Sequence, residues 1–194
     1  MNPFDPLPEK PVLTDGAISL RPATMTDMWP VHGWRNGPHV RRNMYTDHPI
    51  EPWEHQTWYR IALGDPEREI RIIQCDGKDI GVVILSEIDP RHRSASWAFY
   101  IGEADLTGRG VGSAVERLII DHAFTTLGLE TLRCEVLAFN APVLGLHRKF
   151  GFEETGRIEN RVRRDGQPVA AVCLELHRDR WAGDARRAGN GSDR

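Results

Sequence analysis

The chain has 194 residues, of which 40% are hydrophobic and 27% charged, and its formal net charge is -3. That composition indicates a globular protein with one sizeable core, and the charge does not favour nucleic acid or an anionic membrane as a partner. No apolar run approaches the roughly 18 residues of a membrane span, and the first residues lack the basic and apolar regions of a signal peptide. We therefore expect a cytoplasmic protein, with a single domain over residues 1–181 and a disordered tail over 182–194.

Three cysteines, Cys75, Cys134 and Cys173, lie far apart in apolar, strand-like runs. An odd number of separated cysteines favours neither a disulfide framework nor a metal site. We expect buried free thiols that act as small hydrophobic side chains.

The predicted elements mix strands and helices without strict alternation. Asp76-Gly77 and Asp165-Gly166 are strong hairpin signals. From Val111 to Leu127 apolar residues recur at the helical period, and Gly128 ends that helix. In chain order we expect a strand over Ile18–Arg21, a helix over Thr26–Trp34 begun by Thr26 or Asp27, a loop over His39–Ile50, a helix over Pro52–Leu63, strands over Glu69–Cys75, Asp79–Ile88 and Ser94–Ile101, a helix over Val111–Leu127, a strand over Leu132–Leu137, a helix from Asn140 to Phe150, and a hairpin over Ile158–Leu176.

The segment Leu106-Thr107-Gly108-Arg109-Gly110-Val111-Gly112-Ser113 joins an apolar strand to an amphipathic helix. Glycines there let backbone N–H groups crowd around a phosphate at a helix N-terminus, where the helix dipole also favours negative charge. A Walker loop is excluded because no lysine follows Gly112. A dinucleotide-binding fingerprint fits poorly because position 113 is serine and no acid ends the next strand. A plain glycine-rich turn is the alternative.

The same loop resembles the acetyl-CoA loop of the GNAT acetyltransferases, written Arg/Gln-x-x-Gly-x-Gly/Ala, except that Thr107 takes the first position. Asn140 before a helix and Phe150-Gly151-Phe152 after it are similar to a second motif of that family. The order of elements also resembles the GNAT fold, an α/β (α+β) architecture with a central, mostly antiparallel mixed sheet flanked by helices. The resemblance implies acetyl-CoA as co-substrate and no metal, with the coenzyme held by Ile101, Thr107, Arg109, Gly110, Val111, Gly112, Ser113 and Asn140.

Polar and aromatic residues near the N-terminus resemble those of GNAT enzymes that acetylate a UDP-linked 4-amino-4,6-dideoxy sugar in pseudaminic acid biosynthesis. The similar N-terminal segments include Trp34-Arg35-Asn36, Met44-Tyr45-Thr46-Asp47-His48 and Glu54-His55 with Trp58, and the later segment Ser96–Tyr100 also resembles that subgroup. A flat base stacks on aromatic or thioether surfaces, and a diphosphate suits a forked guanidinium. The implied partner is a nucleotide sugar, with Met44, Tyr45 and Trp58 against the base, Arg35 and His55 reaching the phosphates or sugar, and Tyr100 near the acetyl group. For Trp34 and Trp58, simple core packing is the alternative.

The implied chemistry is direct acetyl transfer while both substrates are bound, without a covalent nucleophile. Many GNAT enzymes have a tyrosine seven residues after the helix-leading asparagine, and it protonates the departing thiolate. That position is His147 here, and histidine can donate a proton through either ring nitrogen. A solvated histidine on the helix surface is the alternative.

Glu135 is unusual because it lies inside a strand that we expect to be central. Alternation places Leu132, Cys134 and Val136 on one face of that strand and Glu135 on the other. A carboxylate there is costly unless it is paired or functional. We expect it to act as general base or to orient the amine, and an ion pair with Arg133 or another arginine is the alternative.

Other functions remain open at this stage. A polyamine acetyltransferase would favour an acidic groove, and the basic segment His39-Val40-Arg41-Arg42 argues against one. An acetyltransferase for protein N-termini, of the ribosomal-protein type, differs chiefly between Trp34 and Trp58. A non-catalytic acetyl-CoA-binding module would not need Glu135 or His147. A homodimer is a further expectation.

Overall fold

The computed structural model describes residues 10–106 and 109–181 of the chain. Within these ranges, eight strands form one sheet in the order β1-β2-β3-β4-β5-β6-β8-β7, antiparallel throughout except for the parallel pair β5 and β6. The strands are β1 (Leu13–Asp15), β2 (Ile18–Pro22), β3 (Glu69–Cys75), β4 (Lys78–Asp89), β5 (Ser94–Ile101), β6 (Thr131–Leu137), β7 (Glu153–Arg164) and β8 (Gln167–His177). This is the predicted mixed, mostly antiparallel sheet.

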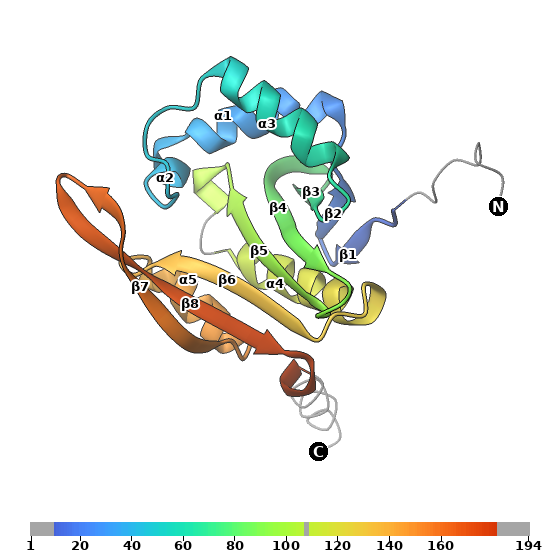
Figure 1. Ribbon diagram of the computed structural model, residues 1–194. Coiled ribbons are helices and arrows are strands. Elements are labelled where there is room, and N and C mark those ends of the chain that lie inside the picture. Colours follow the sequence, from blue (N-terminus) through green and yellow to red (C-terminus); the bar gives the residue numbers. More distant parts are fainter. Residues whose placement is uncertain (1–9, 107–108, 182–194) are drawn as a thin grey trace.

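Helices cover both faces of the sheet. One face carries α1 and α3, which pack on it through Met28, Val31 and Tyr59, and the other carries α4 and α5 over the larger core. Figure 1 shows α1, α2 and α3 gathered on one side of the strands. The helices are α1 (Met28–Asn36), α2 (Pro38–Arg41), α3 (Pro52–Gly64), α4 (Val111–Asp121) and α5 (Ala141–Lys149), with short 3-10 turns over Met25–Asp27 and Ala104–Leu106 and a π-helical turn over His122–Thr126.

Most predicted elements are confirmed, and the differences have local causes. β1 was not expected because three residues carry little pattern, and it exists through its pairing with β2. Pro38, at the first turn of α2, begins a short helix inside the expected loop. After Asp121 the long helix loosens into the π-helical turn, and Gly128, at φ 67°, follows it. The predicted tail over 182–194 lies outside the described residues.

The three cysteines are free thiols, as predicted. Only Cys134 is buried, however, because Cys75 and Cys173 are half-buried near strand surfaces. No helix in the described part of the chain is long and apolar enough to cross a membrane.

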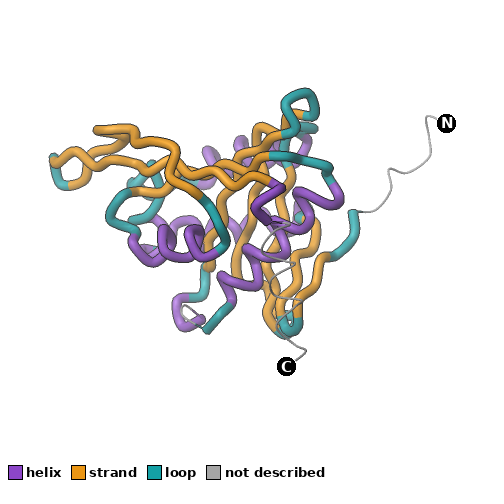
Figure 2. The backbone as a smooth tube through the Cα atoms, turned by 90° about the horizontal axis from the view of Figure 1, so that it is seen from below, coloured by secondary structure: helices purple, strands orange, loops and turns teal. Residues whose placement is uncertain are grey.

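The β7–β8 hairpin extends beyond the rest of the sheet as a two-stranded ribbon (Figures 1 and 2). β7 is the edge strand, and register shifts at Glu154/Gly156 and Ile158/Val162 interrupt its pairing with β8. Such bulges bend and twist an edge strand, which discourages pairing with other chains.

A buried ionic cluster joins the start of the described chain to the end of α4. Glu69 accepts hydrogen bonds from Arg71 and from His122 Nε2, the latter at 2.9 Å. Arg71 is 1% exposed and also donates to Pro11 O at 2.7 Å and Leu20 O at 3.0 Å. Burial alone would raise the pKa of Glu69, but His122 and Arg71 outweigh it and lower the pKa to about 2.

This cluster predicts acid-sensitive stability. The pKa of Glu69 is lower in the folded state than in the unfolded state, so the ionised carboxylate stabilises the fold. Its contribution to the free energy of unfolding is about 3 kcal/mol; it is complete above about pH 4.5 and is lost as pH falls toward about 2. Urea unfolding of the protein and of Glu69→Gln, compared at about pH 6 and about pH 3, measures it. The stability gap between the two proteins should narrow at the lower pH, and a gap that stays constant would contradict the prediction.

Candidate active site

The sheet opens between β5 and β6. The two strands pair from Ser94 with Thr131 to Ser96 with Arg133, and beyond this point they separate, as Figure 1 shows. A cavity of about 320 Å³, called the cleft below, lies in this opening and is lined by both strands and by α5. An elongated ligand can lie there between two strand edges that no longer hydrogen-bond to each other.

The N-terminus of α4 begins at a glycine with left-handed backbone geometry. Gly110, the N-cap residue, has a φ of 84°, which favours glycine over other residues. Val111 and Gly112 form the first turn, where helix geometry provides no acceptor for the backbone N–H groups and the dipole attracts anions. A Cβ on Gly112 would lie 3.1 Å from Leu146 on α5, so this glycine also lets the two helices approach. The predicted pyrophosphate site therefore lies at a helix N-terminus, and the contact of these residues with acetyl-CoA stays a prediction.

The remaining predicted coenzyme residues lie near this helix end or on the cleft, with one exception. Asn140 is the N-cap residue of α5, makes no side-chain capping hydrogen bond and lines the cleft, as Ile101 also does. Arg109 is exposed directly before α4, and the N–H of Ser113 is already used, because it donates to Gly110 O at 3.0 Å. Thr107 lies outside the described residues, so its contact stays a prediction.

His147 is buried on the wall of the cleft. Its side chain is 4% exposed, its Nδ1 lies 2.8 Å from Oε1 of Glu116 on α4, and its ring packs edge-on against Trp97 with 5.3 Å between ring centroids. The alternative of a solvated surface histidine is therefore wrong. The role of proton donor stays a prediction, with the ring at the edge of the cleft where a thiolate would leave.

Glu135 is exposed on β6 and is paired. Its Oε2 accepts a hydrogen bond from the Tyr45 hydroxyl and lies 3.3 Å from Nε of Arg161 on β7. The ion pair considered from the sequence is therefore present, but its partner is Arg161, whereas Arg133 pairs with a carboxylate of β8. Burial and the hydrogen bond to Glu135 raise the pKa of Tyr45 to about 12, so its hydroxyl stays protonated.

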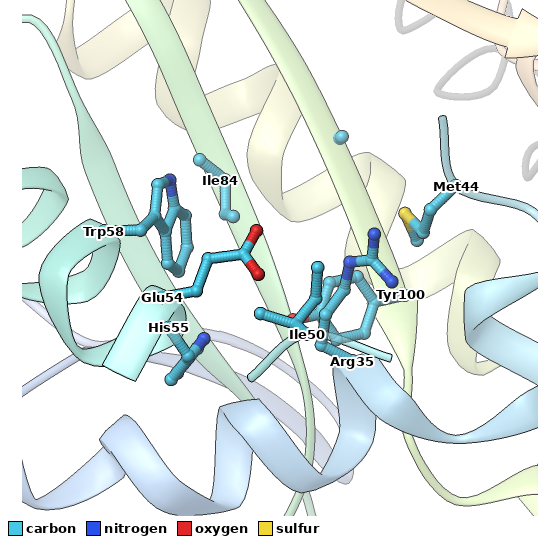
Figure 3. A pocket seen from close by; sticks show the side chains of 9 residues that line it. Arg35, Met44, Ile50, Glu54, His55, Trp58, Ile84 and Tyr100 are labelled. Carbon is cyan, nitrogen blue, oxygen red and sulfur yellow. The ribbon is translucent and has the colours of Figure 1, made fainter. Parts of the chain in front are cut away.

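A second cavity, called the N-terminal cavity below, has a volume of about 260 Å³ and lies between the N-terminal helices and β4 and β5. Five predicted substrate residues come together on its walls, namely Arg35, Met44, His55, Trp58 and Tyr100. Figure 3 shows Trp58 and Arg35 reaching it from different helices, with Met44 beside Arg35. Tyr45 does not join them, because it lies against Glu135 and its ring faces the Arg161 guanidinium at 4.4 Å.

The N-terminal cavity contains one guanidinium and one carboxylate. Nη2 of Arg35 donates to Thr46 O at 2.9 Å, whereas Nη1 is buried and has no partner among the described residues. Burial lowers the pKa of Arg35, which still leaves an arginine charged at neutral pH. Glu54, from the first turn of α3, extends toward the middle of the group in Figure 3.

His55 is part of the cavity wall. It is 2% exposed, its Nε2 donates to Met28 O at 2.8 Å, and its ring packs between His32 and Trp58 at centroid distances of 5.0 and 5.5 Å. Burial lowers the pKa of His55, which favours the neutral ring. Contact with a phosphate through Nε2 would require breaking the bond to Met28.

The two cavities meet beside β5. Met44, Ala98 and Tyr100 line both of them. A third cavity, of about 540 Å³, includes Glu135 and Arg161 and also reaches Ala98. Two ligands bound in the N-terminal cavity and the cleft would therefore meet near Ala98, as direct transfer requires.

The loop before α3 is held by the distant hairpin. Arg164, the last residue of β7, donates to the backbone oxygens of Met44 and Tyr45 and lies 3.2 Å from Asp47. Together with the Arg161 contact to Glu135, this joins the hairpin to one wall of both cavities.

The basic segment lies on the cleft rather than on the N-terminal cavity. His39 and Arg42 line the cleft, and His39 Nε2 donates to Ile101 O at 3.2 Å. The basic segment therefore does not indicate which ligand charge the N-terminal cavity favours. Within residues 10–106 and 109–181, no group of three or more His, Cys, Asp or Glu side chains could hold a metal ion.

Three site residues were missed from the sequence. Glu54 lies beside His55 in a segment that resembles the amino-sugar enzymes, but the sequence indicates no role for it, and Arg161 lies in a charged hairpin that resembles ordinary surface. Glu116 did have a signal, because it lies four residues after Gly112 and four before Ile120, on the side of α4 that becomes buried.

Comparisons with known proteins agree with this geometry. The family model described as an acetyltransferase (GNAT) domain matches residues 18–153. The chain is 29% identical over 164 residues to the spermidine N(1)-acetyltransferase of Escherichia coli (strain K12), covering 83% of this chain and 87% of that one. The crystal structure of spermidine N-acetyltransferase from Vibrio cholerae with CoA and spermine superposes with a TM-score of 0.79 at 21% identity, over 87% of this chain and 99% of that one. A dodecameric form of the Vibrio cholerae enzyme gives a TM-score of 0.74 at 21% identity, over 88% and 99% of the two chains.

The family match spans most of the sheet and both cavities. It includes the glycine at the start of α4, the opening between β5 and β6, and the asparagine before α5. The chain therefore belongs to the GNAT acetyltransferase family and is an acetyl-CoA-dependent N-acetyltransferase.

Proposed function

We propose that the acceptor is the primary amine of a nucleotide-linked amino sugar, bound in the N-terminal cavity while acetyl-CoA occupies the cleft. The observation that carries this proposal is Nη1 of Arg35, a buried cationic donor without an acceptor in the described chain. Such a group costs about 1 to 3 kcal/mol until it finds a partner. A phosphate oxygen of the acceptor would satisfy it, and Trp58 and Met44 offer surfaces for a flat base.

In the proposed acetyl transfer, His147 donates a proton to the leaving thiolate and Glu135 accepts a proton from the amine. The thioester supplies an activated acetyl carbon, which the amine attacks before the carbon–sulfur bond breaks. His147 donates a proton to the departing thiolate from the wall of the cleft. Glu135 accepts the amine proton through Oε1, since its contacts to Tyr45 and Arg161 are both made by Oε2.

A polyamine is the second candidate acceptor. The observation that favours it is the 29% identity to a spermidine acetyltransferase, and Glu54 would attract a cationic amine. Against it stands Arg35 in the same cavity. Two like charges about 5 Å apart cost about 3 kcal/mol at an effective dielectric constant of about 20, which would offset the attraction of Glu54.

A free-thiol assay with acetyl-CoA tests the proposal. The acceptors are a UDP-4-amino-4,6-dideoxy sugar, spermidine, and a peptide with a ribosomal-protein N-terminus, with a reaction lacking acceptor as the control for hydrolysis. We expect kcat/KM to be highest for the nucleotide sugar. Turnover confined to spermidine or to the peptide would overturn the proposal and identify the acceptor class in the same experiment.

A further inference from the structure

Glu116 is a buried carboxyl group in an apolar face of α4. Its side chain is 0% exposed, and the neighbouring Val115 and Ile119 belong to the core. Oε1 meets Nδ1 of His147 at 2.8 Å, whereas Oε2 is buried without a partner in the described part of the chain. A half-satisfied carboxyl group in a core is costly, and an apolar residue of similar volume would often be at least as stable. Stability therefore does not explain why this position carries an acid.

The surroundings of the pair hold the imidazole in one orientation. Trp97 from β5 packs edge-on against the His147 ring at 5.3 Å, and Phe152 lies at 5.2 Å between centroids. With Nδ1 directed at Glu116, the opposite nitrogen, Nε2, is the one available to the cleft that His147 lines. The ring therefore separates a buried carboxyl group on one side from the substrate cleft on the other.

We propose that Glu116 is a positioning residue that acts through His147, holding a shared proton so that Nε2 always presents a proton to the thiolate leaving in the cleft. This inference rests on the proposed donor role of His147. The pair holds two acidic protons when its net charge is zero. Either the carboxylic acid donates to Nδ1 of a neutral ring, or a carboxylate accepts from an imidazolium, and Nε2 carries a proton in both arrangements.

The proton transfer balances within this pair. The Nε2–H bond breaks as the S–H bond of CoA forms, and the shared proton becomes the Nδ1–H of a neutral ring. Glu116 is left as a carboxylate, so the pair carries one negative charge. A proton from solvent restores Nε2 through the cleft after CoA leaves. Without the carboxyl group, a neutral ring that gave up its Nε2 proton would become an anion, which is not accessible at ordinary pH.

The electrostatic surroundings are compatible with a protonated pair. Burial raises the pKa of Glu116, against the opposing effects of His147 and Lys149. Burial also raises the pKa of the Cys134 thiol, which approaches from β6, so that group stays neutral. The two aromatic side chains that pack against the ring, Trp97 on β5 and Phe152 just before β7, are uncharged.

The test compares Glu116→Gln with the parent protein and with Glu159→Gln, which changes the same residue type at an exposed position of β7. Glutamine keeps the shape and one hydrogen bond to Nδ1 but cannot exchange a proton. We expect Glu116→Gln to lower kcat about 10- to 100-fold with little change in the KM for acetyl-CoA, and to move the high-pH fall of kcat to lower pH. Glu159→Gln should change neither.

A second readout does not depend on turnover. Nitrogen-15 NMR of labelled histidine, with the His147 signals assigned by their loss in His147→Phe, reports which ring nitrogens carry protons. The parent protein should show a protonated Nε2 across neutral pH, and Glu116→Gln should lose the second ring proton at a lower pH. Unfolding temperature shows whether Glu116→Gln is folded, and Glu116→Leu, which fills the volume without polar atoms, provides a second variant if it is not.

The outcomes separate the two ideas. Unchanged kcat, pH profile and ring protonation in Glu116→Gln, with His147→Phe impaired, would overturn the role of Glu116 and leave the donor role of His147 standing. Full activity in His147→Phe would overturn the donor role itself, and the role of Glu116 with it.

Discussion

Replacing His147 by phenylalanine is expected to lower kcat by about 100-fold or more, with a much smaller effect on the KM for acetyl-CoA. Phenylalanine keeps the ring contacts to Trp97 and Phe152 but has no proton to donate. The defect should shrink as pH rises toward about 8.5, the ordinary pKa of a thiol, because a thiolate then leaves without protonation. Steady-state kinetics across pH with saturating acceptor measure both effects.

The control for this prediction separates loss of the proton donor from loss of stability at Glu116, the hydrogen-bond partner of His147. Phenylalanine at position 147 leaves the buried Glu116 without its hydrogen bond, which destabilises the fold. The double variant Glu116→Leu/His147→Phe replaces both partners by apolar groups and should recover stability while staying inactive. Recovery of activity together with stability would mean that His147 matters for folding alone.

Replacing Arg35 by methionine is expected to lower kcat/KM for an anionic acceptor about 10- to 100-fold, the value of a charge-assisted hydrogen bond of about 1.5 to 3 kcal/mol. For spermidine the same change should leave kcat/KM unchanged or raise it, because a cation is removed from the cavity. The measurement is kcat/KM for both acceptors in the free-thiol assay. Opposite effects on the two acceptors are the signature of a guanidinium that selects substrates by charge.

Two controls accompany the Arg35 variant. Arg60→Met removes an exposed arginine from α3 and should change neither value. Arg35→Lys keeps the charge but loses the forked geometry and the second N–H group, so it should fall between methionine and the parent. A uniform loss for every acceptor would instead indicate that Arg35 only supports its loop through Thr46.

Local signals predicted much of the fold. The Asp76-Gly77 turn between two apolar runs predicted one hairpin, and the helical period after Gly110 located α4. The separation of β5 from β6 had no local signal, because it depends on how far a parallel pair of distant strands stays in register. The sequence therefore located the N-terminus of α4 more readily than the opening between β5 and β6 that forms the cleft.

In the candidate site too, residues close in sequence could be predicted together, whereas contacts between distant segments could not. Arg35, Met44 and Trp58 were predicted together from one stretch of chain, and they share a cavity. The contacts of Tyr45 with Glu135 and Arg161 join segments about 90 or more residues apart, and no spacing rule connects them. Polar residues near the N-terminus could be assigned to a site, but their partners required the folded chain.

The contacts of Arg164 in the β7–β8 hairpin with the loop before α3 have a consequence for protein engineering. Arg164 holds the backbone at Met44 and Tyr45, so the shape of that loop is set partly by the opposite end of the chain. Replacing the N-terminal segment by that of another acetyltransferase would introduce new side chains without the hairpin contacts that hold the loop in shape. If the N-terminal cavity binds the acceptor as proposed, grafts or recombination libraries should move the N-terminal segment and the β7–β8 hairpin as one unit.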